Sequence, residues 1–201
     1  MMSQIKQTSF DPDALDPENA DTLMPLAWLL RSHPETAFDY LEFRLITSGM
    51  AARMAAERAT EDDRAHLTQA YDTLVAAHGK DDPAEEAAAD LAFHLAIYKS
   101  AHNRVLEHIM RSILTMLRDD VFYNRRRLYR REGVRDLLLR QHKAIYDAIM
   151  ARDPENARIA SEKHIRFTRD SLKEAQVSEK RLQVSNRRVG RDPLSAIVDR
   201  G

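Results

Sequence analysis

The sequence predicts an all-α protein that folds as an antiparallel bundle of six or seven helices. Residues that favour helices, namely Ala, Leu, Arg and Glu, dominate the composition, and glycine occurs only 5 times in 201 residues. Apolar residues recur at helical spacing, whereas no segment alternates with a period of two over the length of a strand. Capping residues then divide the chain into helices of ordinary length.

The amino-terminal part of the chain predicts a lead-in and three helices. Residues 1–20 carry Pro, Asp, Asn and Ser without periodicity, so we expect a flexible lead-in, followed by a short helix over 23–31. Thr60, with Asp63 three residues later, predicts a capping box that opens a helix ending at Gly79. The first long helix is expected from Pro34 to about Arg58, with apolar positions at Phe38, Leu41, Leu45, Ile46, Met50 and Ala52.

The rest of the chain predicts four more helices. Pro83 suits the first turn of a helix, Asn103 caps the next one, and Asp153 caps the last, with Pro154 in its first turn. These helices are expected over residues 83–101, 103–117, 134–151 and 154–176.

Composition indicates one soluble domain with tails. Apolar residues make up 43% of the chain and charged residues 31%, which suits a helical domain with a single core. We expect this domain over 21–178, followed by a basic, disordered tail over 179–201. No apolar run is long enough to cross a bilayer, and the amino terminus lacks the charged-then-apolar order of a signal peptide. A cytoplasmic protein with no membrane partner is therefore expected.

Four residues of metal-ligand type lie on the apolar faces of three predicted helices. Asp90 and His94 are four residues apart, so both side chains project from one face of a helix. His142 shares its face with leucine and isoleucine, and His164 shares its face with alanine, phenylalanine and leucine. Because the chain has no cysteine, any metal must be bound by nitrogen and oxygen ligands. Three histidines and one aspartate suit zinc and other divalent first-row metals and leave coordination positions open.

The alternative is that these histidines are ordinary core residues, each hydrogen-bonded to a carbonyl or carboxylate. Spacing alone leaves the two interpretations about even. The other histidines lie at helix ends or on polar faces, and we interpret them as surface residues: His33, His66, His78, His102 and His108.

Arg44 lies among apolar residues in the first long helix. A guanidinium on a buried face favours an anion, ideally a carboxylate bound through two hydrogen bonds. Taken alone, the side chain is better explained by a stem on the core and a charged head in solvent or paired with an acid such as Glu42. Beside a metal, however, the arginine would complete a binding site for a carboxylate.

Charge and motifs exclude several other functions. The net charge is −1, so the whole chain is not a nucleic-acid-binding polycation. Two basic segments, 123–135 and 179–191, are interpreted as solvated faces or partner surfaces rather than as DNA contacts. The sequence contains neither a phosphate-binding loop nor a dinucleotide-binding fingerprint nor a nucleophile elbow.

The motifs, taken in order, resemble a known family. The resemblance lies in four segments: SHPETAFDYLEFR, GMAARMAAERATEDD, DLAFHLAIYKSAHNRVLEHI and QHKAIYDAIMARDPENARIASEKHIRF. Over residues 24–178 the chain is similar to the FadR C-terminal (FCD) effector-binding domain of GntR-family bacterial transcription regulators. The branch of the pyruvate-dehydrogenase repressor and the lactate regulator is the most similar.

This resemblance implies a helical bundle whose cavity binds a divalent metal at the positions of Asp90, His94, His142 and His164. Zinc is the first candidate, with nickel and manganese as alternatives. A small carboxylate effector would coordinate the metal, and Arg44 matches the arginine of the family's first helix that lines the cavity. The resemblance also implies a homodimer.

Two departures from the family pattern affect these expectations. Many relatives carry an acidic residue where this chain has Ser48, which leaves the identity of the acid open. Family regulators also place a winged helix-turn-helix domain before the bundle, whereas only about twenty irregular residues precede it here. We therefore expect this chain to act on DNA only through a winged-helix domain that it lacks.

Three functions are carried forward, ranked by how well they fit the sequence. The first is a sensor of a small organic acid within a transcriptional regulator, and it implies no enzymatic activity. The second is a metal-free helical interaction or dimerisation module, in which the histidines are core residues. The third is a metalloenzyme with an Asp/His site, although no general base is apparent beside the ligands.

Overall fold

A computed structural model describes residue 33 and residues 36–80, 82–116 and 133–189 of the chain. Within these ranges all regular structure is helical, which confirms the all-α prediction. The elements are α2 (Thr36–Arg58), α3 (Glu61–Gly79), α4 (Pro83–Ser100), α5 (Arg104–Met116), α7 (Val134–Met150) and α8 (Pro154–Val189).

The capping residues define the helix boundaries as predicted. The Thr60 side chain accepts a hydrogen bond from the backbone of Asp63, and the Asp63 carboxylate accepts one from the backbone of Thr60, forming a capping box. Asp82 caps α4, where Pro83 occupies the first turn. At the start of α8, Oδ1 of Asp153 accepts a hydrogen bond from the backbone of Asn156 at 3.0 Å.

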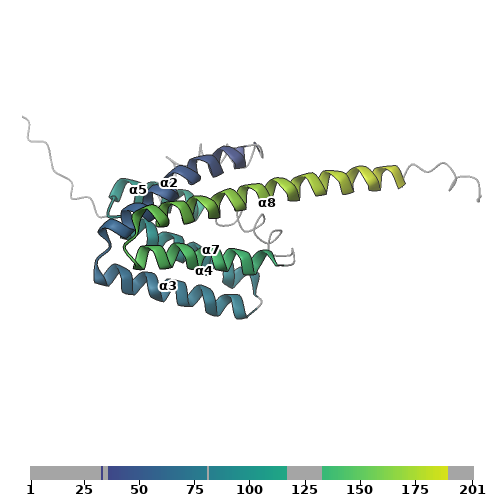
Figure 1. Ribbon diagram of the computed structural model, residues 1–201. Coiled ribbons are helices and arrows are strands. Elements are labelled where there is room, and N and C mark those ends of the chain that lie inside the picture. Colours follow the sequence, from purple (N-terminus) through teal and green to yellow (C-terminus); the bar gives the residue numbers. More distant parts are fainter. Residues whose placement is uncertain (1–32, 34–35, 81, 117–132, 190–201) are drawn as a thin grey trace, which may run out of the picture.

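The helices pack as an antiparallel bundle around one main core. Helix α8 packs on α2 and α7, and α3 packs on α4 and α7, so that α4 and α7 lie between α3 and α8 (Figure 1). Side-chain pairs show that α2 and α8 are antiparallel, because Gly49 lies beside Glu162 whereas Arg53 lies beside Glu155.

Small residues on α2 allow this close packing. A Cβ atom at Gly49 would lie only 3.0 Å from Cγ of Glu162 on α8. The buried face of α2 agrees only in part with the predicted one, since Leu41 and Ala52 are buried whereas Ile46 is 69% exposed and Met50 is 39% exposed. The residues of α2 in the main core are alanines, which let neighbouring backbones approach closely; they are Ala51, Ala52, Ala55 and Ala56.

Some boundary predictions were wrong or fall outside the described residues. Helix α8 ends at Val189 rather than near Gln176, so the first part of the tail predicted to be disordered is helical, and α8 runs past the other labelled helices (Figure 1). The lead-in, the short helix over 23–31 and most of the basic segment 123–135 lie outside the described residues.

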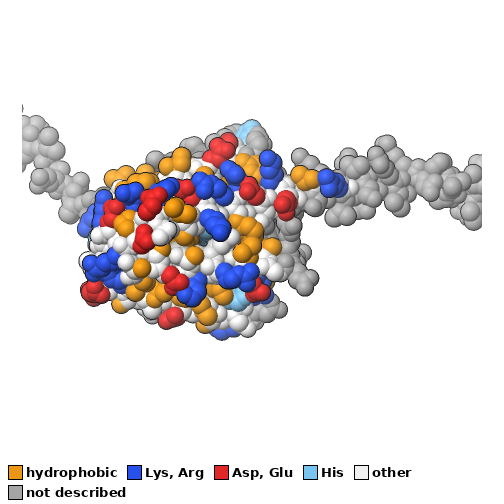
Figure 2. All heavy atoms as spheres, in the orientation of Figure 1, with side chains coloured by type: hydrophobic (Ala, Val, Ile, Leu, Met, Phe, Trp, Pro, Cys, Tyr) orange, Lys and Arg blue, Asp and Glu red, His pale blue; other side chains and the backbone are white. Residues whose placement is uncertain are grey.

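The surface carries charges of both signs. Figure 2 shows Lys and Arg side chains interspersed with Asp and Glu across the described part of one face. Such mixing does not form the single-sign field that recognises a nucleic-acid backbone. Among the described residues, no helix is long and apolar enough to span a membrane.

Candidate metal centre

The four residues singled out by the sequence meet at one buried point. Asp90 and His94 come from α4, His142 from α7 and His164 from α8, and each residue is at most 3% exposed. One ligand atom from each residue lies within 4.8 Å of the corresponding atoms of the other three. The packing of three helices thus assembles the cluster whose members the sequence places far apart.

The Asp90 carboxylate faces two of the imidazoles. Its Oδ1 lies 3.1 Å from Nε2 of His142, and its Oδ2 lies 3.8 Å from Nε2 of His94. The ring centroids of His142 and His164 are 4.4 Å apart, and those of His94 and His164 are 5.2 Å apart. Three rings and one carboxylate therefore surround a common centre.

The environment keeps the cluster suited to a cation. Burial holds the pKa of His94 well below its usual range, and the charges of Arg44 and His142 lower it further. A neutral imidazole is the form that binds a metal. Among the described residues, Nε2 of His94 has no hydrogen-bond partner, which a buried polar atom rarely lacks. This donor set fits zinc, nickel or manganese, and a divalent ion would satisfy the orphaned nitrogen.

Arg44 lies in the same interior, close enough to His94 for its charge to lower the pKa of that histidine. It projects from α2, is 2% exposed, and forms no ion pair with any described residue. Within the part of the chain that the structure describes, its Nε and Nη2 atoms have no hydrogen-bond partner. These two donors form the edge of a guanidinium that binds a carboxylate through parallel hydrogen bonds. The burial of Arg44 rules out the alternative in which its head reaches solvent.

Two hydroxyl groups near Arg44 were not identified from the sequence. The hydroxyls of Ser48 and Tyr98 are 2.6 Å apart and both residues are buried. Burial raises the pKa of Tyr98, although the nearby Arg44 charge opposes this rise. Tyr98 lies one turn after His94 on α4, a spacing that would have placed it beside the cluster had it been considered.

Gln141 is a further neighbour that the sequence did not single out. Its Oε1 lies 3.1 Å from Nδ1 of His164. Gln141 directly precedes His142, so α7 contacts two histidines of the cluster through consecutive residues.

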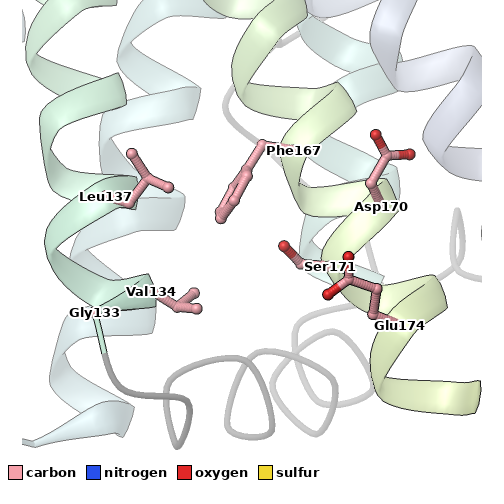
Figure 3. Close-up of a pocket in the computed structure, with 7 residues that line it drawn as sticks. All are labelled: Gly133, Val134, Leu137, Phe167, Asp170, Ser171 and Glu174. Carbon is pink, nitrogen blue, oxygen red and sulfur yellow. The ribbon is translucent and has the colours of Figure 1, made fainter. Parts of the chain in front are cut away.

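An open pocket of about 330 Å³ lies between α7 and α8. Figure 3 shows Leu137 and Phe167 facing each other across this pocket. Leu137 is one turn before Gln141 on α7, and Phe167 is three residues after His164 on α8. The lining residues are Gly133, Val134, Leu137, Phe167, Asp170, Ser171 and Glu174, so none of the four clustered residues lines this pocket.

A second buried polar network lies one turn before Asp90 on α4. Nε of Arg135 donates to Oε2 of Glu86 at 2.8 Å, and Nδ1 of His78 lies 2.8 Å from Oε1 of the same carboxylate. Nε2 of His78 lies 3.0 Å from Oδ1 of Asp136. His78 lies at a helix end, as predicted, but its side chain is only 19% exposed, because three helix ends meet around it. The other four histidines interpreted as surface residues are exposed.

Comparisons with known proteins place the chain in a family. The FCD domain family matches residues 39–167. The chain is 34% identical over 151 residues to the Glc operon transcriptional activator of Escherichia coli strain K12, covering 74% of the chain and 59% of that protein. It is also 34% identical over 151 residues to the putative L-lactate dehydrogenase operon regulatory protein of the same strain, covering 75% and 57%.

A third relative, the galactonate operon transcriptional repressor of Escherichia coli strain K12, is 32% identical over 151 residues, covering 74% of the chain and 64% of that protein. The aligned region spans less than two thirds of the length of each of these three relatives. All three are named as transcriptional regulators rather than as enzymes. The family match covers more than half of the chain and includes all four residues of the buried cluster. The chain therefore belongs to the FCD domain family, the family of GntR-type transcriptional regulators that its sequence resembles.

Proposed function

We propose that the chain is the effector-sensing domain of a GntR-type bacterial regulator and that it binds a divalent metal together with a small organic acid. Asp90, His94, His142 and His164 are the proposed metal ligands, and Arg44 is the proposed contact for the acid. One observation carries this proposal: a buried Asp/His cluster lies close enough to Arg44 for this arginine, which is buried and has no ion pair among the described residues, to lower the pKa of His94.

The chemistry of the site explains why an acid is the expected ligand. A bound divalent ion supplies a Lewis-acidic centre with open positions, because the protein offers four ligand residues. Arg44 adds a fixed positive charge and two buried hydrogen-bond donors, Nε and Nη2, that have no partner among the described residues. A carboxylate satisfies both needs, whereas a neutral ligand leaves the guanidinium unpaired.

Binding at this site would act on the packing of four helices. The proposed ligands come from α4, α7 and α8, and Arg44 comes from α2. A metal and an acid held among them favour one relative arrangement of these helices over others, which is the requirement for a ligand to shift a conformational equilibrium. In the complete regulator, a winged-helix domain outside this chain would respond to that shift and contact DNA.

Three further parts of the proposal come from the family resemblance and the composition. Zinc is the first candidate for the metal, with nickel and manganese as alternatives. The working form is a homodimer, and the protein acts in the cytoplasm.

Calorimetry on metal-loaded protein tests the proposal. The panel contains pyruvate, L-lactate, glycolate, malate and galactonate. We expect saturable heat with at least one acid, loss of that heat in Arg44→Ala, and loss of metal uptake in His142→Ala. Arg53→Ala is the matched control, because Arg53 lies on the same helix with its side chain 43% exposed. If the protein takes up no metal and no acid gives heat, the sensor proposal fails and a metal-free interaction module becomes the better explanation.

A further inference from the structure

Gln141 contacts a proposed metal ligand without being one itself. Its amide oxygen lies 3.1 Å from Nδ1 of His164, which is 2% exposed. Consecutive residues of a helix project about 100° apart, so α7 can direct His142 into the cluster and Gln141 toward α8. The two residues thus give α7 one direct and one indirect connection to the same centre.

The chemistry of imidazole determines which atom donates the hydrogen bond between His164 and Gln141. A neutral histidine carries its proton on one ring nitrogen and offers a lone pair on the other. His94 and His142 both present Nε2 toward Asp90. If His164 also presents Nε2 to the centre, its Nδ1 carries the proton and donates to an acceptor. The amide oxygen of Gln141 is in position to be that acceptor.

We propose that Gln141 is a positioning residue that holds His164 in the tautomer with its Nε2 lone pair toward the metal. We propose also that its neutral amide leaves the positive charge of the centre available to the anionic effector. This inference rests on the proposed metal site.

The second half of the proposal follows from comparing an amide with a carboxylate at this position. Glutamate would accept the same hydrogen bond and would make the imidazole a stronger ligand, as carboxylate–histidine–metal arrangements do. It would also place a second negative charge beside the centre, where Asp90 already supplies one. An anion approaching the metal would then be repelled through a poorly screened interior.

Two variants of Gln141 separate the hydrogen bond from the charge. Gln141→Met keeps the approximate volume and removes the acceptor, whereas Gln141→Glu keeps the acceptor and adds a charge. Gln69→Met is the matched control, because Gln69 is exposed on α3. Thermal unfolding of each metal-free variant checks that it folds.

The first measurement is a titration with Zn²⁺ alone. Removing a hydrogen-bond partner of a metal-ligating histidine typically costs about 10-fold to 100-fold in metal affinity, and we expect this loss for Gln141→Met. Gln141→Glu should bind Zn²⁺ at least as tightly as the wild type. In the metal-free proteins, ¹⁵N NMR of the imidazoles should show the His164 proton on Nδ1 in the wild type and in Gln141→Glu, but a mixture of tautomers in Gln141→Met.

The second measurement uses azide, a small monoanion, as a probe of the open positions on Co²⁺-loaded protein. Visible spectra should show that Gln141→Glu binds azide about tenfold more weakly than the wild type, at equal metal occupancy.

The outcomes distinguish this inference from the proposed function. Wild-type protein that takes up neither Zn²⁺ nor Co²⁺ overturns the metal site and the inference together. If the wild type binds Zn²⁺ and Gln141→Met binds it equally well, only the positioning role is overturned. Unchanged azide affinity in Gln141→Glu overturns the charge role alone.

Discussion

Two buried polar networks lie one helical turn apart on α4, and they differ in how their charges are paired. In the first, the carboxylate of Glu86 contacts both Arg135 and His78, each at 2.8 Å. In the second, Nε2 of His94 has no hydrogen-bond partner among the described residues, and no described residue forms an ion pair with the buried guanidinium of Arg44.

The difference separates a structural network from a binding site. A buried charge is costly unless it is paired and hydrogen-bonded. The Glu86 network meets this condition from within the chain, and it joins the end of α3 to the beginnings of α4 and α7. Within the described part of the chain, neither Nε2 of His94 nor the guanidinium of Arg44 meets it, so a cation and an anion from solution would complete this second network. The predictions below test this contrast, from the largest expected effect to the smallest.

Metal should stabilise the protein through the Asp90 cluster and not through the Glu86 network. At a free Zn²⁺ concentration about a thousand times the dissociation constant, the free energy of unfolding should rise by about 4 kcal/mol. His142→Ala should abolish this gain, whereas His78→Ala should preserve it, because His78 belongs to the other network. Chemical denaturation with and without Zn²⁺ measures both. Equal loss of the gain in the two variants would remove the distinction between the networks.

Removing Glu86 should destabilise the metal-free protein. Glu86→Ala leaves Arg135 and His78 without their shared carboxylate, and breaking a buried ion pair in this way typically costs about 3 kcal/mol. Glu85→Ala is the control, since Glu85 is exposed and should change the free energy of unfolding by less than about 0.5 kcal/mol. Urea denaturation distinguishes them, and similar small losses in both would show that the Glu86 network is not structurally important.

Removing the charge of Arg44 should raise the free energy of unfolding, whereas removing Glu86 should lower it. Arg44→Met replaces a buried charge that has no ion pair among the described residues with an apolar side chain, so the metal-free protein should gain about 1 kcal/mol in free energy of unfolding. The same variant should lose the heat of acid binding. Arg53→Met, on the exposed side of the same helix, should alter neither quantity. A large loss of stability in Arg44→Met would indicate a structural partner for the guanidinium and would contradict its proposed role.

Lowering the pH should decrease the free energy of unfolding of the metal-free protein, in part because His94 becomes protonated on unfolding. Its pKa is lowered in the folded state by burial, so the unfolded chain binds this proton at a higher pH than the folded chain does. The stabilising contribution is therefore complete above the unfolded value of about 6.5 and is lost as the pH falls below it, by about 1 kcal/mol over one unit. Denaturation at pH 7.5, 6.5 and 5.5 should show a shallower slope for His94→Phe. An identical slope in both proteins would contradict this assignment.

Local signals were enough to predict most helix boundaries. Thr60, Asp82 and Asp153 act through hydrogen bonds that span only two or three residues, so their effect is visible in the sequence. The end of α8 was predicted less well, because the polar residues after Gln176 neither stop a helix nor show an apolar face.

The face of α2 that is buried could not be predicted from its large apolar residues alone, because much of that face consists of small residues. The α2 pattern drew attention to Ile46 and Met50, yet the core uses a run of alanines on another face of the same helix. Close approach to α8 at Gly49 selects this face, and that approach depends on a helix more than a hundred residues later in the chain.

The sequence by itself determined the helices, their caps and the Asp90–His94 pair, because these depend on interactions between near neighbours in the chain. It also identified Arg44, His142 and His164 as polar residues on apolar faces. Only the tertiary structure decided that the four possible ligands meet within 4.8 Å, that Arg44 is buried with no ion pair to any other described residue, and that Gln141 contacts His164. These features depend on how helices distant in the sequence rotate and pack against one another, and no local pattern specifies that rotation.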